Sequence, residues 1–421
     1  MPKRILRFFV VFNALLTMGV SLSIAGDHSL GGYLKSYFYI FQPASIEGPF
    51  GTEFDPSAEV LLSNRLRVQA SYTPTARIRL EAAYDIAPRF QSASLSADSL
   101  LFGRINPFAY RAADFDSNLY PSEGEVSGHF ELGQNLDRVS LSLRLPSADV
   151  IIGRQAIAWG SARVMNPTDV LAPFTFDALD TEDRIGIDAI RARIPIGILS
   201  EIDVGYVFGR DFEFRNSAFF MRAGFNTSRT DISLLLMGFR ENLLLGIDMA
   251  RPVGGAGVWL ESAYVFSDFF NTEETSGRDY FRATAGMDYN LTGKTYGFVE
   301  YHFNGAGSTL ASDYLNSFKE TAYQEGSVYL LGRHYIVPGL VYQCTPLISC
   351  TIQSLINVTD PSIFLSSQLD YNIGNNIYLG LGAFIGIGEN PTISGPLTTV
   401  SYRSEFGGYP NFYFASLRYY F

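Results

Sequence analysis

The chain has 421 residues and a formal net charge of −11, with 47% hydrophobic, 14% aromatic and 17% charged residues. The excess of acidic residues argues against nucleic acid as a partner. After residue 25 no apolar run is long enough to cross a bilayer as a helix, which excludes an ordinary helical membrane protein. The aromatic content is high for a soluble protein, so a sheet with one apolar face has to be considered.

The first 25 residues have the composition of a secretory leader. Lys3, Arg4 and Arg7 precede an apolar run over residues 8–20, and Ser23 and Ala25 are small residues before position 26. We therefore expect cleavage after Ala25 and a single domain over residues 26–421. The alternative is a retained membrane anchor, for which the run is short, because a spanning helix needs about 20 residues.

Residues 60–86 alternate between apolar and polar side chains. The apolar side of 60–72 includes Val60, Leu66 and Val68, and its polar side includes Arg65 and Arg67. The alternation breaks near 73–76 and resumes over 78–86, which predicts a hairpin of two long strands. The same pattern recurs along most of the chain. A closed transmembrane antiparallel β-barrel explains it, since every second side chain then faces lipid, every second faces a wet lumen, and all backbone polar groups are paired.

The predicted connections alternate in length. Short turns fall near 73–76, 146–148, 195–200, 226–229, 251–256, 291–294, 345–349 and 373–376. Between them lie mostly longer connections, near 42–58, 88–126, 160–184, 210–217, 268–278, 304–326 and 388–411, and shorter ones near 240 and 360. Short periplasmic turns and long extracellular loops are expected of an outer-membrane barrel. We count 18 strands, from a first over 30–41 to a last over 412–421, and 16 strands is the alternative.

Charged residues on the polar faces are expected to line the lumen, because a charge facing mid-bilayer lipid costs about 2 to 4 kcal/mol. All but four of the 31 basic residues are arginine, whose planar guanidinium binds carboxylates and phosphates through paired hydrogen bonds. The predicted lining residues are Arg65, Arg67, Arg77, Arg79, Glu81, Asp85, Arg138, Arg144, Arg191, Arg193, Arg222, Arg282, Asp288 and Glu300. Facing rows of arginines and acids would set up a transverse field. The alternative is that the arginines only pair with neighbouring acids and fill the barrel.

A segment with little alternation contains GRQAIAWG, residues 153–160, followed by NPTD, residues 166–169. Its glycines at 153 and 160 predict a bend or a close backbone approach, Trp159 suits the lipid interface, and Asn166 with Pro167 starts a turn. The segment is similar to one found in porin-like outer-membrane families, including relatives of polysaccharide-export barrels, in which a strand runs into an ordered loop.

The remainder of this loop is acidic, with Asp169, Asp177, Asp180, Glu182 and Asp183. Residues 26–29 alone would precede the first predicted strand after cleavage, which leaves no room for an amino-terminal plug. We therefore predict that this loop folds into the lumen and forms a constriction against the arginines. The alternative is an outer loop that stays solvated or binds divalent cations together with lipopolysaccharide.

Cys344 and Cys350 are the only cysteines, and they flank the predicted turn at 345–349. In an oxidising periplasm, thiols on facing arms of a hairpin can form a disulfide if their Cα atoms lie within about 7 Å. We predict this disulfide, although closing so small a loop would stabilise the fold little. The alternative is a pair of unbridged cysteines.

The last strand ends in Phe421, with Tyr419 and Leu417 on the same face. This ending resembles that of bacterial outer-membrane β-barrels. The resemblance implies that Tyr419 and Phe421 belong to a signal read by the barrel assembly machinery.

The sequence predicts no catalytic or metal-binding arrangement. The four histidines have no metal-ligand spacing, and His302, two residues after Glu300, fits a lumen wall better than a general acid or base. No nucleophile of a hydrolase at the barrel rim stands out. We therefore expect no enzymatic activity, no cofactor and no metal.

Together these patterns predict an outer-membrane channel, a porin, for passive diffusion of small hydrophilic solutes, anions among them, through an arginine-lined lumen. The expected partners are outer-membrane lipid and lipopolysaccharide, the assembly machinery, the solutes and further copies of the chain in a homotrimer. Two alternatives stay open: an export conduit for an acidic polysaccharide, and a structural or adhesin barrel plugged by its loops.

Overall fold

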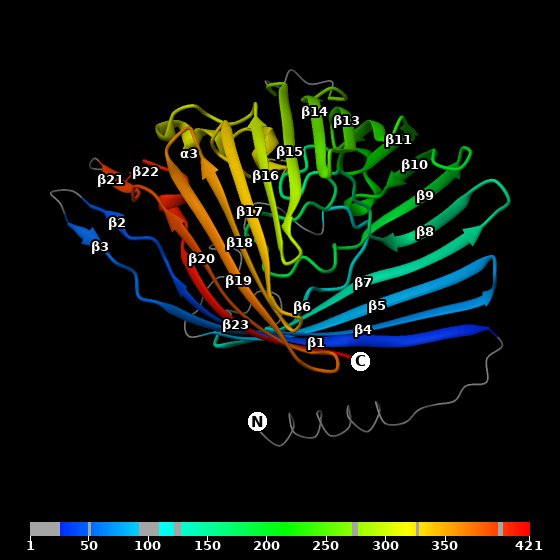
Figure 1. The fold of residues 1–421 in the computed structure, drawn as a ribbon, viewed down its shortest axis with the longest axis horizontal. Helices are drawn as coiled ribbons and strands as arrows, with labels where there is room; N and C mark the ends of the chain where they lie inside the picture. Colours follow the sequence, from blue (N-terminus) through cyan, green and yellow to red (C-terminus); the bar gives the residue numbers. More distant parts are fainter. Residues whose placement is uncertain are drawn as a thin grey trace.

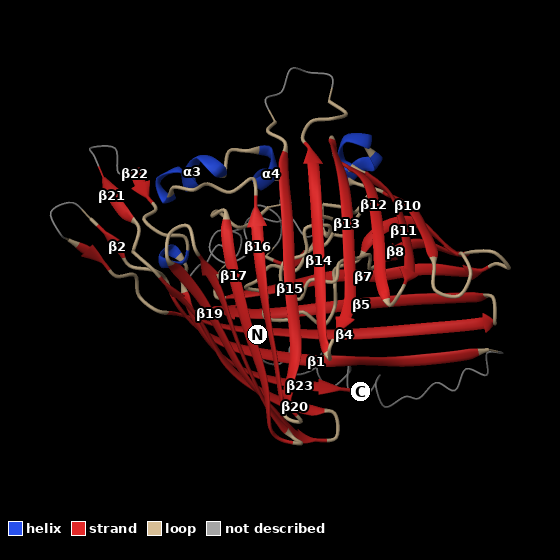
Figure 2. Cartoon of the chain, turned by 45° about the horizontal axis from the view of Figure 1, so that its top comes forward, coloured by secondary structure: helices blue, strands red, loops and turns tan. Residues whose placement is uncertain are grey.

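The computed structural model describes residues 26–48, 52–91, 109–121, 128–271, 277–325, 328–394 and 399–421. The predicted leader and its cleavage site lie outside the described residues. Within them, antiparallel strands wind into a closed barrel whose connections are short at one end and long at the other (Figures 1 and 2).

Eighteen strands form the barrel wall, each paired with its two neighbours. They are β1 (Asp27–Gln42), β4 (Glu59–Thr75), β5 (Ile78–Gln91), β7 (Phe130–Arg144), β8 (Asp149–Gln155), β9 (Ile187–Pro195), β10 (Glu201–Val207), β11 (Ala218–Thr227), β12 (Thr230–Phe239), β13 (Asn242–Val253), β14 (Ala256–Phe266), β15 (Tyr280–Thr292), β16 (Thr295–Asn304), β17 (His334–Thr345), β18 (Ile348–Asn357), β19 (Ser362–Gly374), β20 (Ile377–Ile387) and β23 (Asn411–Tyr420). Because β23 pairs with β1, the sheet has no free edge.

The remaining described elements are short. A strand β6 (Asn118–Tyr120) adds to β7, and a small second sheet contains β2 (Ile46–Glu47), β3 (Glu53–Phe54), β21 (Thr392–Ser394) and β22 (Thr399–Ser401). The helices are α3 (Tyr314–Ser317) and α4 (Thr321–Gln324), with 3₁₀ turns at Arg210–Phe212, Phe214–Asn216, Ala311–Asp313 and Phe406–Gly408. The small sheet and both α-helices lie at the long-loop end (Figure 2). No described helix has the length and apolarity needed to cross a membrane.

The strand count of 18 is confirmed, and the alternative of 16 is wrong. All eight predicted short turns fall between consecutive barrel strands at one end, for example between Thr75 and Ile78 and between Thr292 and Thr295. The carboxyl terminus lies at this same end, beside β1 (Figure 1).

The alternation of side chains is visible in their exposure. On β16, Val299 and Tyr301 are 41% and 44% exposed on the outside, whereas Glu300 and His302 between and beside them are buried in the interior. On β1, Leu34 is 44% exposed and Lys35 only 1%. Ionic groups therefore point inward and apolar groups outward, as the period of two in the sequence predicts.

The lumen is partly filled by apolar side chains as well. One buried cluster joins inward residues of β9–β15 to residues from three connections, among them Tyr110, Ile157, Leu171, Tyr314 and Leu331. A second cluster joins inward aromatic residues of β1, β19, β20 and β23 to Met165 and Phe406. These two clusters occupy space that the sequence patterns had assigned to water.

Candidate functional site

The connection over residues 156–186, between β8 and β9, lies inside the barrel and contacts much of its inner wall. Its contacts run in chain order along β10 and β11, then β13–β16, then β18–β20, then β1 and β4, and finally β7. The predicted inward folding of this loop is what the structure shows. Its path is set by a series of charged and aromatic contacts.

The loop begins with Trp159, whose Nε1 donates to Asp203 Oδ2 on β10 at 3.3 Å. Its ring packs edge-on against inward-facing Phe220 of β11, with ring centroids 4.7 Å apart. The expectation that Trp159 lies at the lipid interface is therefore wrong. In a lumen that contains apolar clusters, an indole finds both an apolar surface and a hydrogen-bond acceptor inside the barrel.

The two glycines of the motif are needed at close approaches of the backbone. Gly160 has φ +112°, and a Cβ there would lie 2.7 Å from Glu261 Oε2. Gly153 has φ +110°, and a Cβ there would lie 2.3 Å from the carbonyl oxygen of Val139. Both positions combine a positive φ with no room for a side chain, as the sequence predicts.

Two buried wall carboxylates hold the backbone of the loop. Glu261 Oε1 accepts hydrogen bonds from Thr168 N at 2.9 Å and Thr168 Oγ1 at 2.7 Å. Glu300 accepts hydrogen bonds from the backbone N–H groups of Arg163 and Val164, the latter at 3.1 Å, and from Trp259 Nε1 at 3.0 Å. Because a buried charge is tolerated only when it is hydrogen-bonded, each carboxylate fixes the loop segment that satisfies it.

Donors from the wall complete this anchor. Arg282 Nη2 donates to the carbonyl oxygen of Pro167 at 2.7 Å, and Thr284 Oγ1 donates to that of Met165 at 2.7 Å. Residues 162–168 are thus held by acceptors and donors on β14, β15 and β16. The side chain of Arg163 extends to Asp288, with an Nη2–Oδ2 distance of 2.6 Å.

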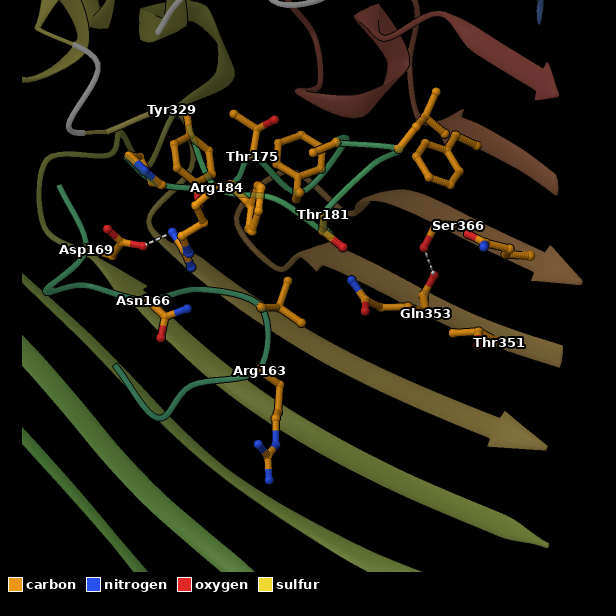
Figure 3. A pocket seen from close by; sticks show the side chains of 18 of the residues that line it. Arg163, Asn166, Asp169, Thr175, Thr181, Arg184, Tyr329, Thr351, Gln353 and Ser366 are labelled. Carbon is orange, nitrogen blue, oxygen red and sulfur yellow. Dashed lines mark hydrogen bonds and ion pairs between the residues drawn. The ribbon is translucent and has the colours of Figure 1, made fainter. Parts of the chain in front are cut away.

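The next part of the loop contains an internal ion pair between Arg184 and Asp169 (Figure 3). Arg184 also donates to the carbonyl oxygen of Ala172 at 2.7 Å and lies over the ring of Phe174, 4.5 Å from its centroid. Burial raises the pKa of Asp169 to about 6, although Arg184 opposes this shift. The pair fastens the two ends of the 169–184 segment to one another.

Phe176 sits at the centre of an aromatic cluster on the β18–β20 side. Its ring centroid lies 5.0 Å from that of Phe364, 5.5 Å from Tyr409, 5.7 Å from Phe406 and 6.2 Å from Tyr329. This cluster joins the loop to two of the long connections and narrows the lumen there.

The predicted acidic stretch then meets a lysine that the sequence analysis did not single out. Lys35 Nζ lies 2.8 Å from Asp180 Oδ2 and 2.6 Å from Glu182 Oε2. Asp183 accepts a hydrogen bond from Tyr33 Oη at 2.7 Å. Lys35 is 1% exposed, so its two ion pairs lie in the interior and hold the loop against β1.

Two wall arginines lie next to this stretch: Arg67 is buried, and Arg65 is partly exposed, at 28% of its side chain. Arg67 contacts Asp85 at 3.3 Å and Asp137 at 2.8 Å, and its Nε lies 3.8 Å from Asp183. Arg65 contacts Asp85 at 2.8 Å and Asp180 at 3.7 Å. Both arginines therefore hold the loop in place; Arg67 is enclosed, whereas Arg65 also borders solvent-accessible space.

The buried ionic network continues into a second connection. Arg154 contacts Asp188 at 2.7 Å and Asp114 at 2.9 Å, and Arg111 donates to the carbonyl oxygen of Gly186 at 2.9 Å. Residues 109–114 and the end of the 156–186 loop are thereby locked to β8 and β9. None of these five residues was predicted as a site residue, because their partners are distant in sequence.

Most other predicted lining arginines form ion pairs with neighbouring acids. The pairs are Arg79 with Glu81, Arg138 with Asp137, Arg144 with Asp149, Arg191 with Asp203 and Arg193 with Glu201, at 2.6 to 3.9 Å. Arg222 instead donates to Ser233 Oγ at 2.6 Å. For Arg77, no acidic partner lies within ion-pair distance among the residues that the structure describes. These ion pairs are the ones expected if the arginines pair with neighbouring acids, which is the alternative to an arginine-lined lumen.

A cavity of about 410 Å³ lies between the loop and the wall strands β18, β19 and β20. Figure 3 shows Thr175, Thr181, Arg184 and Asp169 of the loop on one side and Thr351, Gln353 and Ser366 of the strands on the other. Aromatic surface comes from Phe174, Phe176, Tyr329 and Phe384. This is the open space beside the predicted constriction, and it faces a different wall from Arg65 and Arg67.

The structure brings Cys344 and Cys350 together without a bond between them. Their Sγ atoms lie 3.3 Å apart on adjacent strands at the short-turn end. The disulfide remains a prediction. Within the described parts of the chain, no three His, Cys, Asp or Glu side chains are arranged to hold a metal ion.

Comparison with known proteins supports the fold. No family model matches the chain, and no curated protein matches it by sequence. Among solved structures, OccAB4 of Acinetobacter baumannii is similar with 9% identity and a TM-score of 0.55, over 95% of this chain and 99% of that chain. OccK8 (OprE) of Pseudomonas aeruginosa is similar with 9% identity and a TM-score of 0.54, over 94% and 98%. OpdK of Pseudomonas aeruginosa, solved with vanillate, is similar with 10% identity and a TM-score of 0.52, over 93% and 98%. The chain therefore shares a porin-like barrel fold with these proteins.

Proposed function

We propose that the protein is an outer-membrane channel for passive diffusion of small hydrophilic solutes, made as a precursor whose leader is removed after Ala25. The observation that carries this proposal is the 156–186 loop, held inside a closed barrel and leaving a cavity of about 410 Å³ along one wall. An 18-stranded barrel is wide enough to enclose water unless loops fill it. Passage of a solute through such a channel makes and breaks no bond.

The finer part of the proposal is a modest preference for anions. Arg79 and Arg163 are 54% and 50% exposed, although each contacts one acid. A guanidinium paired with a carboxylate has little net charge, so its effect on a passing ion is small. Of the predicted lining arginines, Arg77, Arg79, Arg144 and Arg193 are exposed, and all of these but Arg77 are paired with an acid among the described residues. Lipopolysaccharide and the barrel assembly machinery remain proposed partners. A homotrimer remains the proposed oligomeric state.

A second candidate function is a barrel plugged by its loops. The two buried apolar clusters favour this candidate, because they bring residues of several connections into the lumen. In that case the chain would serve as a structural or adhesive surface protein, and opening would require the loops to move.

Conductance of the purified protein in a planar bilayer separates the two candidates. The channel proposal predicts discrete current steps, with a permeability ratio that favours chloride over potassium by a small factor. A protein that is folded, as shown by its heat-dependent migration in detergent gels, and that co-floats with the lipid after reconstitution but carries no current contradicts the channel and supports the plugged barrel.

A further inference from the structure

The cavity beside the loop has a wall of uncharged hydrogen-bonding groups. The inward-facing residues of β18 and β19 that line it are Thr351, Gln353, Ser366 and Gln368. The next inward charge along β19 is Asp370, which is already paired with Arg418. A solute in this cavity therefore meets hydroxyl and amide groups along the strands, not ions.

Four polar side chains that line the cavity are available to a ligand, because they form no hydrogen bond in the described structure. They are the hydroxyl groups of Thr175 and Thr181 on the loop, the hydroxyl group of Thr351 on β18, and the side-chain amide of Gln353 on β18. Figure 3 shows the Gln353 side chain extending from its strand toward the loop segment that contains Thr181. Together they supply both donors and acceptors.

A buried carboxylate, Asp169, borders the cavity behind this set. Asp169 also lines the cavity and is 3% exposed, and its Oδ1 has no hydrogen-bond partner in the described structure. Its Oδ2 is engaged by Arg184. Because Oδ1 is shielded from solvent, a ligand in the cavity does not reach it, and the hydrogen-bonding groups open to a ligand are the hydroxyl and amide groups named above.

The basic groups of the cavity are neutralised or turned away. Arg184 is paired with Asp169, and Arg163 with Asp288. Figure 3 shows Arg163 directed away from Asp169 and Arg184. An anionic ligand would have to compete with these existing carboxylates, whereas an uncharged ligand would not.

The apolar part of the cavity suits the faces of a small ring. Phe174, Phe176 and Phe384 present aromatic surface beside the free hydroxyl and amide groups. A volume of about 410 Å³ falls within the usual size of small-ligand sites, which combine apolar walls with a few placed polar groups. A sugar ring has this dual character, with hydroxyl groups at its edge and C–H groups on its faces.

We infer that this cavity is a binding subsite for an uncharged polyhydroxylated solute, a sugar, in which Gln353, Thr351 and Thr181 bind the hydroxyl groups. The inference rests on the proposed function and names the class of solute that passes through the channel. It places the selective contacts on β18, β19 and the loop, and not on the arginines of β4 and β5.

The test is ligand-detected saturation-transfer NMR with glucose and glucuronate on protein in lauryldimethylamine oxide, a detergent without a sugar head group. The two probes share a ring and differ in one carboxylate. Glucose should receive saturation, and glucuronate should receive less. Gln353→Leu and Thr351→Val should each reduce the glucose signal by about threefold to tenfold, the effect of one lost neutral hydrogen bond. Gln343→Leu, the same change on an inward position of β17 outside the cavity, should leave it unchanged.

The inference is overturned if glucose receives no saturation, if the cavity variants bind it as well as the native protein does, or if glucuronate gives the stronger signal. The measurement needs no ion current. A protein that conducts but does not bind glucose therefore refutes the sugar subsite alone, whereas one that binds glucose and stays silent in a bilayer refutes the channel alone.

Discussion

Asp169 is buried beside the cavity and forms an ion pair with Arg184. Arg184 from the loop and Arg282 from β15 face it, but burial outweighs them and raises its pKa to about 6. In an unfolded chain an aspartate titrates near pH 3.9. The folded protein therefore binds this proton more tightly than the unfolded chain does, and ionisation of Asp169 costs stability.

This pKa shift gives a pH-dependent prediction. As pH rises from about 4 to about 6, the native protein should lose stability relative to Asp169→Asn, which cannot titrate, and the difference should be constant above about pH 7. Denaturant midpoints measured in detergent between pH 4 and pH 7.5 would show it. A difference that is constant over this range, or that changes in favour of the native protein, contradicts the assigned environment.

Single residues of the site could be predicted only in part. The acids Asp180 and Glu182 were found because acids are dense in that loop, but their partner Lys35 was not. The sequence did contain a sign of this role: Lys35 is one of only four lysines, and it lies in the first predicted strand. Which charge meets which depends on how the loop crosses the barrel, and the local pattern does not contain that information.

Glu300 is one of the two wall carboxylates that hold the 156–186 loop inside the barrel. Removing the carboxylate leaves the N–H groups of Arg163 and Val164 and the indole of Trp259 without an acceptor. Each buried donor left without a partner costs about 1–3 kcal/mol. Local opening of residues 162–168 should therefore become much more frequent.

We predict that Glu300→Leu accelerates hydrogen exchange of the amides of residues 162–168 by about tenfold or more. Glu300→Gln keeps one acceptor oxygen and should give a smaller increase. Glu81→Leu removes a lumen carboxylate that is paired with Arg79 and contacts no part of the loop, so exchange there should not change. Equal exchange in Glu300→Leu and the native protein would show that the wall carboxylate does not hold the loop.

Strands were more predictable than loops, for a physical reason. A strand between lipid and lumen must alternate, so its period of two marks both its existence and its inner face. A loop folded into the lumen has no such requirement. Trp159 was misplaced for this reason, because an aromatic residue in a loop gives no sign of whether it meets lipid or an apolar cluster inside the barrel.

At the scale of the whole molecule, the alternation and the turn spacing determine a closed barrel of 18 strands. They do not determine how much of its interior is filled. Apolar residues of at least three connections enter the lumen, and the open cavity is left beside β18–β20, which β23 and β1 separate from the arginine-rich hairpin of β4 and β5. The central claim is that solutes pass along the uncharged hydrogen-bonding residues of β18 and β19, Thr351, Gln353, Ser366 and Gln368.

Current block at a single introduced thiol tests that claim most directly. In a background with Cys344 and Cys350 changed to serine, Gln353→Cys would place a thiol in the cavity, and Ser354→Cys would place one on the outer face of the same strand. A bulky methanethiosulfonate reagent applied during single-channel recording should reduce the current stepwise in Gln353→Cys and leave Ser354→Cys unaffected. An undiminished current after labelling of Gln353→Cys, confirmed by mass spectrometry, would contradict a path between the loop and β18–β20.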